Sequence, residues 1–170
     1  MKKNTILFYI FLVLAVAINV FIIVEGATAG DRSASQSFGF TQMFIDFVKT
    51  FAPDSPIVTD PDTTHAVIRK LVGHFGLFGV SGIITTVDFL LVKEALVNKK
   101  RIVIIGSLSV GLIVAFISEL AQLFTPGRYF SMIDVLIDFS GYLLFGGITF
   151  TIFYLVYRHK EKKNNVSAMG

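Results

Sequence analysis

The run Leu71–Val92, LVGHFGLFGVSGIITTVDFLLV, decides the fold class of this chain. Its side chains are apolar or small, apart from His74 near the start and Asp88 near the end. A helix rises ~1.5 Å per residue, so a run of about 20 residues crosses a hydrocarbon core of ~30 Å. A single segment can cross only as a helix, because every backbone N–H and C=O must find its partner inside the segment. The run therefore predicts a transmembrane helix.

Three further apolar runs are long enough to cross: Thr5–Val24, Ile102–Phe124 and Tyr129–Tyr157. The last exceeds the membrane thickness, so we expect tilt or an end that projects into the interface. Of the 170 residues, 54% are hydrophobic and 16% are charged, whereas a soluble domain carries about 25% charged residues. Alternating strands of the barrel type are absent. We therefore predict an all-α polytopic membrane protein with four transmembrane helices.

Composition also excludes several kinds of site. Cys is absent, so disulfides, thiolate nucleophiles and Cys-ligated metals are excluded. The three histidines, His65, His74 and His159, form no close ligand pair in the sequence, and we expect neither a metal nor a cofactor. No soluble segment combines clustered Lys and Arg with exposed aromatics, so no nucleic-acid partner is expected. Membrane lipids are the expected partners, and the oligomeric state is left open.

The basic residues predict the orientation. With the N-terminus in the cytoplasm, ten of the 15 Lys and Arg residues lie on the inner side, most of them clustered at span ends. The inner residues are Lys2, Lys3, Lys93, Lys99, Lys100, Arg101, Arg158, Lys160, Lys162 and Lys163, and the outer residues are Arg32, Lys49, Arg69, Lys70 and Arg128. Both termini are therefore expected in the cytoplasm. A cleaved signal peptide is the alternative for the first run, since Ala27-Thr28-Ala29 resembles a cleavage site.

These runs divide the chain into a first transmembrane helix (1–24), an extracytoplasmic loop (25–67), a three-helix membrane core (68–157) and a basic cytoplasmic tail (158–170). An amphipathic helix is expected at about 38–51, because apolar side chains recur there at helical spacing. Its apolar face comprises Phe40, Met43, Phe44, Phe47, Val48 and Phe51. We expect this helix to lie flat on the outer leaflet. The alternative is a lid packed on the outer ends of the spans.

Two groups of glycines predict close helix packing. Gly73, Gly76, Gly79 and Gly82 recur every three residues in the second run, and Gly141, Gly146 and Gly147 lie in the fourth. Without side chains, such ridges let another helix approach closely. We interpret both groups as packing surfaces.

Ionisable and amide residues at the outer ends of the runs are the strongest indication of function. They are Arg69, Lys70, His74, Glu119, Gln122, Arg128, Asp134 and Asp138. Lys70/His74 and Asp134/Asp138 are i,i+4 pairs and Glu119/Gln122 is an i,i+3 pair, so each pair shares a helix face. Counted from Phe124 and Tyr129, Glu119 and Asp134 lie ~7–8 Å below their helix ends and Asp138 ~13 Å below.

A charge facing lipid at such depth costs on the order of 3 kcal/mol, so these groups must face inward. One interpretation is a polar pocket open to the outer leaflet that binds a headgroup, with Arg128 in bidentate contact with a carboxylate. The alternative is a buried ion-pair network that joins the helices. Within a pocket, His74 could exchange protons with Glu119 or Asp138, but no catalytic residue is assigned. Asp88, at the far end of its run, is interpreted as interfacial.

The stretch Glu119–Gly141, ELAQLFTPGRYFSMIDVLIDFSG, resembles the signature of VanZ-like membrane proteins: Glu, Gln, a Pro-Gly-Arg turn, Asp, a usual Asn four residues on, and Gly. The stretch Arg69–Phe75, RKLVGHF, resembles the family's upstream Arg-Lys-x-x-His-Phe element, with three residues instead of two between Lys70 and His74. The resemblance covers roughly Arg69 to Gly147. Asp138 departs from the pattern, because a carboxylate stands where the family commonly has Asn.

The resemblance implies a multi-pass protein of the bacterial cytoplasmic membrane, in a family whose founding member is associated with resistance to the lipoglycopeptide teicoplanin. On that basis we expect a cell-envelope protein, more a binding protein than an enzyme. Its pocket would bind a lipid headgroup or a lipid-linked cell-wall intermediate and lower susceptibility to such antibiotics. The alternatives are an intramembrane enzyme acting on a lipid-linked substrate and a structural subunit whose charges join helices.

Overall fold

The computed structural model describes residues 3–28, 30–92 and 99–167, and every regular element in these ranges is helical. The elements are α1 (Lys3–Gly26), α2 (Gly30–Phe51), α3 (Pro56–Thr59), α4 (Pro61–Ile68), η1 (Arg69–Gly76), α5 (Leu77–Leu91), α6 (Lys100–Gln122) and α7 (Met132–Ser167). Four helical stretches in the described part are long and apolar enough to cross a membrane. The predicted all-α class with four spans is confirmed.

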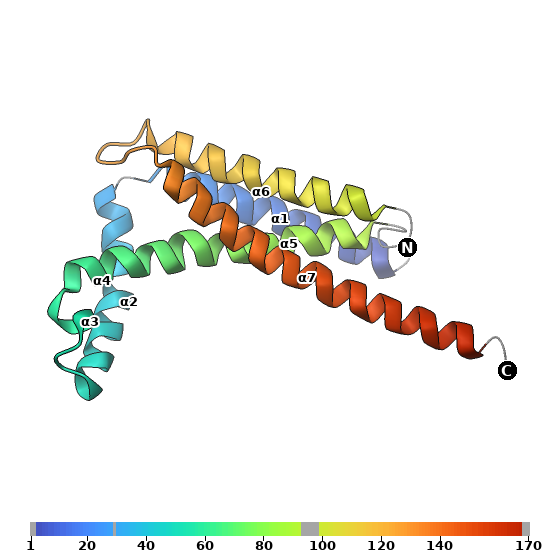
Figure 1. The fold of residues 1–170 in the computed structure, drawn as a ribbon. Helices are drawn as coiled ribbons and strands as arrows, with labels where there is room; N and C mark the ends of the chain where they lie inside the picture. Colours follow the sequence, from blue (N-terminus) through green and yellow to red (C-terminus); the bar gives the residue numbers. More distant parts are fainter. Residues whose placement is uncertain (1–2, 29, 93–98, 168–170) are drawn as a thin grey trace.

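The four spans form one bundle (Figure 1). α1, the continuous rod α4–η1–α5, α6 and α7 lie side by side, and α7 projects beyond the others. The start of α1 and the end of α7 lie at one end of the bundle, and α2, α3 and α4 lie at the other (Figure 1). This arrangement agrees with both termini on the same side of a membrane. Which side that is stays a prediction from the basic residues.

Three helix boundaries differ clearly from the sequence prediction. The second span begins at Pro61 instead of Leu71, because proline fits the first turn of a helix and Asp60 caps it through Thr63 N (3.2 Å). The fourth helix begins at Met132, so the depth counted from Tyr129 was overestimated. Asp138 lies ~9 Å along the axis from Met132 at ~1.5 Å per residue. α7 continues helically to Ser167, through most of the segment expected as a tail.

The bundle has a small core, because most apolar side chains of the spans face outward. The buried cluster comprises Ile22, Phe78, Val114, Ala115, Val135 and Tyr142. The outward-facing side chains include Val13 on α1, which is 66% exposed. Such surfaces are those that lipid covers in a membrane.

Close helix approach at two glycines fixes α7 against the η1–α5 rod. A Cβ on Gly82 would lie 2.5 Å from the Tyr142 carbonyl oxygen, and one on Gly141 would lie 2.2 Å from the Phe75 carbonyl oxygen. The packing interpretation is therefore confirmed at these positions. Gly73 and Gly147 face open space. Gly73 instead lines a cavity described below.

The helix predicted at about 38–51 exists but is longer, since α2 begins at Gly30. It packs against α3 and α4 and runs across the direction of the bundle helices (Figure 1). Thr41 and Ile45 are buried in this packing, while Phe47 and Phe51 are exposed by 65% and 75%. The apolar face is thus free of protein contacts over much of its area. Its position on a lipid surface remains a prediction.

The structure shows how Asp88 is packed, while its depth at the membrane interface stays a prediction. This residue is only 8% exposed, and its Oδ1 has no hydrogen-bond partner among the described residues. Asp88 therefore lies within the helix packing and not at an open surface.

Candidate functional site

Two contacts between η1 and α7 form the first part of the site. Lys70 Nζ lies 2.6 Å from Asp134 Oδ1, and His74 Nδ1 lies 2.9 Å from Asp138 Oδ1. The partners advance by four residues on both elements, so each predicted pair does share a face. η1 has π-helical hydrogen bonding over Arg69–Gly76. Such widened turns occur mostly as short insertions and are frequent at functional sites.

Glu119 of α6 is the most enclosed carboxylate of the site. Its exposed fraction is 0%, yet both oxygens accept hydrogen bonds. Gln122 Nε2 donates to Oε1, and the backbone N–H of Ser131 donates to Oε2 at 3.1 Å. The predicted Glu119/Gln122 pair is therefore a direct contact. The segment that enters α7 supplies the second donor.

Arg128 does not make the predicted bidentate contact with a carboxylate. Its Nε donates to Gln122 Oε1 at 3.1 Å, and its Nη1 donates to the carbonyl oxygens of Glu25 and Thr28, both at 3.3 Å. Carbonyl groups at the end of α1 lack partners within the helix and carry the negative end of its dipole, so a guanidinium binds them well. Arg128 thus ties the end of α1 to the α6–α7 turn.

The electrostatic surroundings of Arg128 are mixed. Burial lowers the pKa of its guanidinium below the ordinary value; Glu119 acts in the opposite direction and Arg69 lowers it further. Asp134 and Glu25 act on this pKa in the same direction as Glu119. Guanidinium groups bind anions through paired N–H donors.

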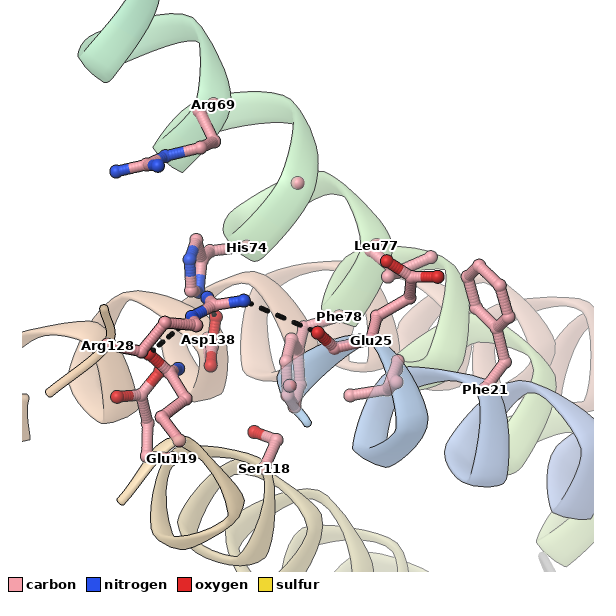
Figure 2. A pocket seen from close by; sticks show the side chains of 14 residues that line it. Phe21, Glu25, Arg69, His74, Leu77, Phe78, Ser118, Glu119, Arg128 and Asp138 are labelled. Carbon is pink, nitrogen blue, oxygen red and sulfur yellow. Dashed lines mark hydrogen bonds and ion pairs between the residues drawn. The ribbon is translucent and has the colours of Figure 1, made fainter. Parts of the chain in front are cut away.

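These residues surround a cavity of ≈ 420 Å³ between α1, η1, α6 and the start of α7. Six of the eight predicted residues line it: Arg69, His74, Glu119, Gln122, Arg128 and Asp138. Figure 2 shows His74 beside Asp138, with Arg128 and Glu119 below them and Arg69 above. Among the described residues, the side chain of Arg69 has no hydrogen bond or ion pair, although it lies at the cavity wall. Lys70 and Asp134 pair beside the cavity and are not among its lining residues.

One wall of the cavity comes from α1, which the sequence reasoning did not place there. Phe21, Ile22, Glu25 and Gly26 line this wall. A Cβ on Gly26 would lie 2.6 Å from the Ser118 carbonyl oxygen, so α1 and α6 approach closely at this point. The feature of the sequence that could have indicated this wall is Glu25, an acidic residue directly after the first apolar run.

A further group of potential ligands emerges only in three dimensions. One ring nitrogen of His74 and one carboxylate oxygen from each of Glu119 and Asp134 lie within 4.8 Å of one another. The three residues come from η1, α6 and α7. Nothing in their sequence spacing indicates this, because a single histidine is far from both acids along the chain.

Comparisons with known proteins place the chain by family alone. No curated protein and no solved structure matches it. A sequence model of the family described as VanZ/LLP1 matches residues 7–156, which include most of α1, the outer helices, the cavity residues and most of α7. The earlier resemblance rested on two short motifs, whereas this match also covers the first span. The chain therefore belongs to the VanZ/LLP1 family.

Proposed function

We propose that this membrane protein binds the phosphate-bearing headgroup of an anionic lipid, or of a lipid-linked cell-wall intermediate, in the cavity. The observation that carries the proposal is Arg69, a guanidinium at the cavity wall with no ion pair among the described residues. Arg128, which lines the same cavity, supplies a second guanidinium. Arginine matches phosphate oxygens with paired N–H donors, so an anion entering here would gain bidentate contacts.

The remaining charges explain why the proposal rests on Arg69 and not on every charged residue of the site. Lys70 and His74 already contact acids on α7, and these contacts join helices whether or not a ligand binds. A network that served only to join helices would leave no cation beside a cavity unpaired, because a half-buried charge without a partner is costly. Arg69 thus favours a ligand over a purely structural role.

Thermal unfolding of the purified protein with added lipids tests the proposal. We expect phosphatidylglycerol, cardiolipin or a polyprenyl phosphate to raise the midpoint, whereas phosphatidylcholine should not, because a ligand stabilises by RT ln(1 + [L]/Kd). Comparing these lipids separates bulk anionic headgroups from lipid-linked intermediates. Arg69→Gln should abolish the shift, and Lys49→Gln, the same charge change on the exposed surface of α2, should retain it. An equal shift in Arg69→Gln would refute the proposal.

Arg69→Gln tests ligand binding with less disturbance of the fold than Arg128→Ala. Arg128 holds the end of α1 through two carbonyl contacts, so its removal would disturb the fold and the ligand site together. Arg128→Ala is therefore informative only where its unliganded midpoint stays close to that of the wild type.

The proposal extends to antibiotic susceptibility. A protein that engages lipid headgroups or cell-wall intermediates at the outer surface would alter how lipoglycopeptides reach their target. Expression in a susceptible Gram-positive host should raise the minimum inhibitory concentration of teicoplanin, and Arg69→Gln at equal protein levels should not. If both proteins raised the minimum inhibitory concentration equally, any resistance would not depend on Arg69 in the cavity.

A further inference from the structure

We propose that His74, Glu119 and Asp134 form a site for one divalent transition-metal ion of the Zn²⁺ type. Their ligand atoms, one nitrogen and two carboxylate oxygens, lie within 4.8 Å of one another. Imidazole nitrogen combined with carboxylate oxygen suits zinc and its neighbours, whereas magnesium and calcium prefer oxygen alone. This proposal uses neither Arg69 nor Arg128 and does not depend on headgroup binding.

The contact with Asp138 prepares His74 for this role. An ionised carboxylate can only accept a hydrogen bond, so with Asp138 as acceptor the proton is on Nδ1 and Nε2 keeps its lone pair. Metal-binding histidines characteristically donate their other N–H to a carboxylate or a carbonyl, which fixes the ring and makes it a stronger ligand. Asp138 is 1% exposed and has little freedom to move away.

The second argument is two buried carboxylates, Glu119 and Asp138, which contact neither Lys nor Arg in the described part of the chain. Asp138 Oδ2 is buried and has no hydrogen-bond partner among the described residues. Glu119 is fully buried, and its hydrogen bonds come from an amide side chain and a backbone N–H, neither of which carries a charge. Buried carboxylates are normally paired with cations or bound to metals. A divalent cation would pair with these carboxylates.

The existing contacts leave room for coordination. A carboxylate oxygen has two lone pairs, so each Glu119 oxygen retains one after accepting its hydrogen bond. Lys70 occupies only Oδ1 of Asp134, and its side chain is 42% exposed, so it can turn toward water. Bonds of ~2.0–2.2 Å to a tetrahedral ion place ligand atoms about 3.4 Å apart. The ligand atoms, now within 4.8 Å of one another, would therefore close in by up to about 1.4 Å.

The site would also have an open position. His74 and Glu119 line the cavity, and Asp134 lies beside it, so a fourth ligand would face the cavity interior. Three protein ligands with one position left for water or another molecule is the arrangement of open zinc sites. Should a phosphate headgroup bind in the same cavity, one of its oxygens could take this position.

Zinc binding to the full-length protein, purified without a polyhistidine tag and stripped with a chelator, tests the proposal. Equilibrium dialysis should give one Zn²⁺ per chain, and His74→Gln or Glu119→Gln should lower the affinity at least 10-fold. Asp138→Asn retains all three ligands and should weaken binding 10–100-fold through the orientation of His74. His65→Gln is the matched control, because His65 stacks on Phe38 away from the cluster, and it should bind zinc as the wild type does.

The outcomes that would overturn the site are equally specific. Wild-type protein that retains no zinc, or His74→Gln that binds zinc as tightly as the wild type, would eliminate it. Where a variant proves too unstable to purify, Asp134→Asn replaces it, with the same expected loss. Preference for Mg²⁺ over Zn²⁺ would contradict the metal class. Arg69→Gln should bind zinc normally, so failure of the headgroup proposal and failure of this one give different results.

Discussion

His74 Nδ1 lies 2.9 Å from Asp138 Oδ1, and this contact joins η1 to α7 inside the site. The neighbouring Lys70–Asp134 contact is shorter, at 2.6 Å, but its side chains are 42% and 16% exposed. For His74 and Asp138 the corresponding values are 16% and 1%. Solvent weakens the outer contact far more than the inner one, so the longer contact should contribute more to stability.

Double-mutant cycles measure this difference. With alanine replacements at each position, the coupling free energy of Lys70 with Asp134 should be about 0.2–1 kcal/mol, as for exposed pairs. The coupling of His74 with Asp138 should be about 1.5–3 kcal/mol, as for a hydrogen bond to a charged group. Reversible unfolding in mixed micelles gives the free energies, with a chelator present to exclude metal. A larger coupling for Lys70 with Asp134 would contradict the proposed order.

The spacing of residues predicted which side chains share a helix face but not which residues they contact. Lys70/His74 and Asp134/Asp138 could be paired from i,i+4 spacing because helix periodicity is local. The contacts of Arg128 could not be predicted from spacing. Its carbonyl acceptors belong to Glu25 and Thr28 at the end of α1, about a hundred residues earlier in the chain. That proximity depends on how the whole bundle packs. Only tertiary structure reveals it.

The prediction of two helix starts was wrong for a related reason. Pro61 precedes the apolar run, and proline can interrupt a helix; yet proline also favours the first turn of a helix, and Asp60 caps that turn. The two roles of proline are indistinguishable without the cap. The same uncertainty shifted the start of α7 from Tyr129 to Met132.

Glycine replacements test the close approach of α7 to the η1–α5 rod. Gly141→Ala would place a Cβ 2.2 Å from the Phe75 carbonyl oxygen, and because backbone must move, the free energy of unfolding should fall by about 1–3 kcal/mol. Gly147→Ala is the matched control on the same helix. It has nothing within 4 Å, so it should be neutral or raise stability by up to about 1 kcal/mol through helix propensity. Thermal unfolding in detergent distinguishes the two, and a stable Gly141→Ala would contradict the packing.

The orientation can be tested directly because the chain has no Cys. Single cysteines at Lys49 on α2 and Lys160 on α7 occupy exposed positions at opposite ends of the molecule. The basic residues predict that a membrane-impermeant maleimide labels Lys49→Cys on intact cells. Lys160→Cys should react only after the membrane is opened. Labelling with the reverse pattern would place both termini outside.

Tryptophan fluorescence tests whether α2 lies on the lipid surface, because the chain has no Trp of its own. α2 runs across the direction of the spans, and Phe47 on its apolar face is 65% exposed (Figure 1). A helix lying in the interface buries such side chains ~5–10 Å into the boundary of the acyl region. In nanodiscs with brominated acyl chains, Phe47→Trp should therefore show blue-shifted emission and strong quenching. Lys49→Trp, on the opposite face, should show neither, whereas a helix held away from lipid would leave both tryptophans unquenched.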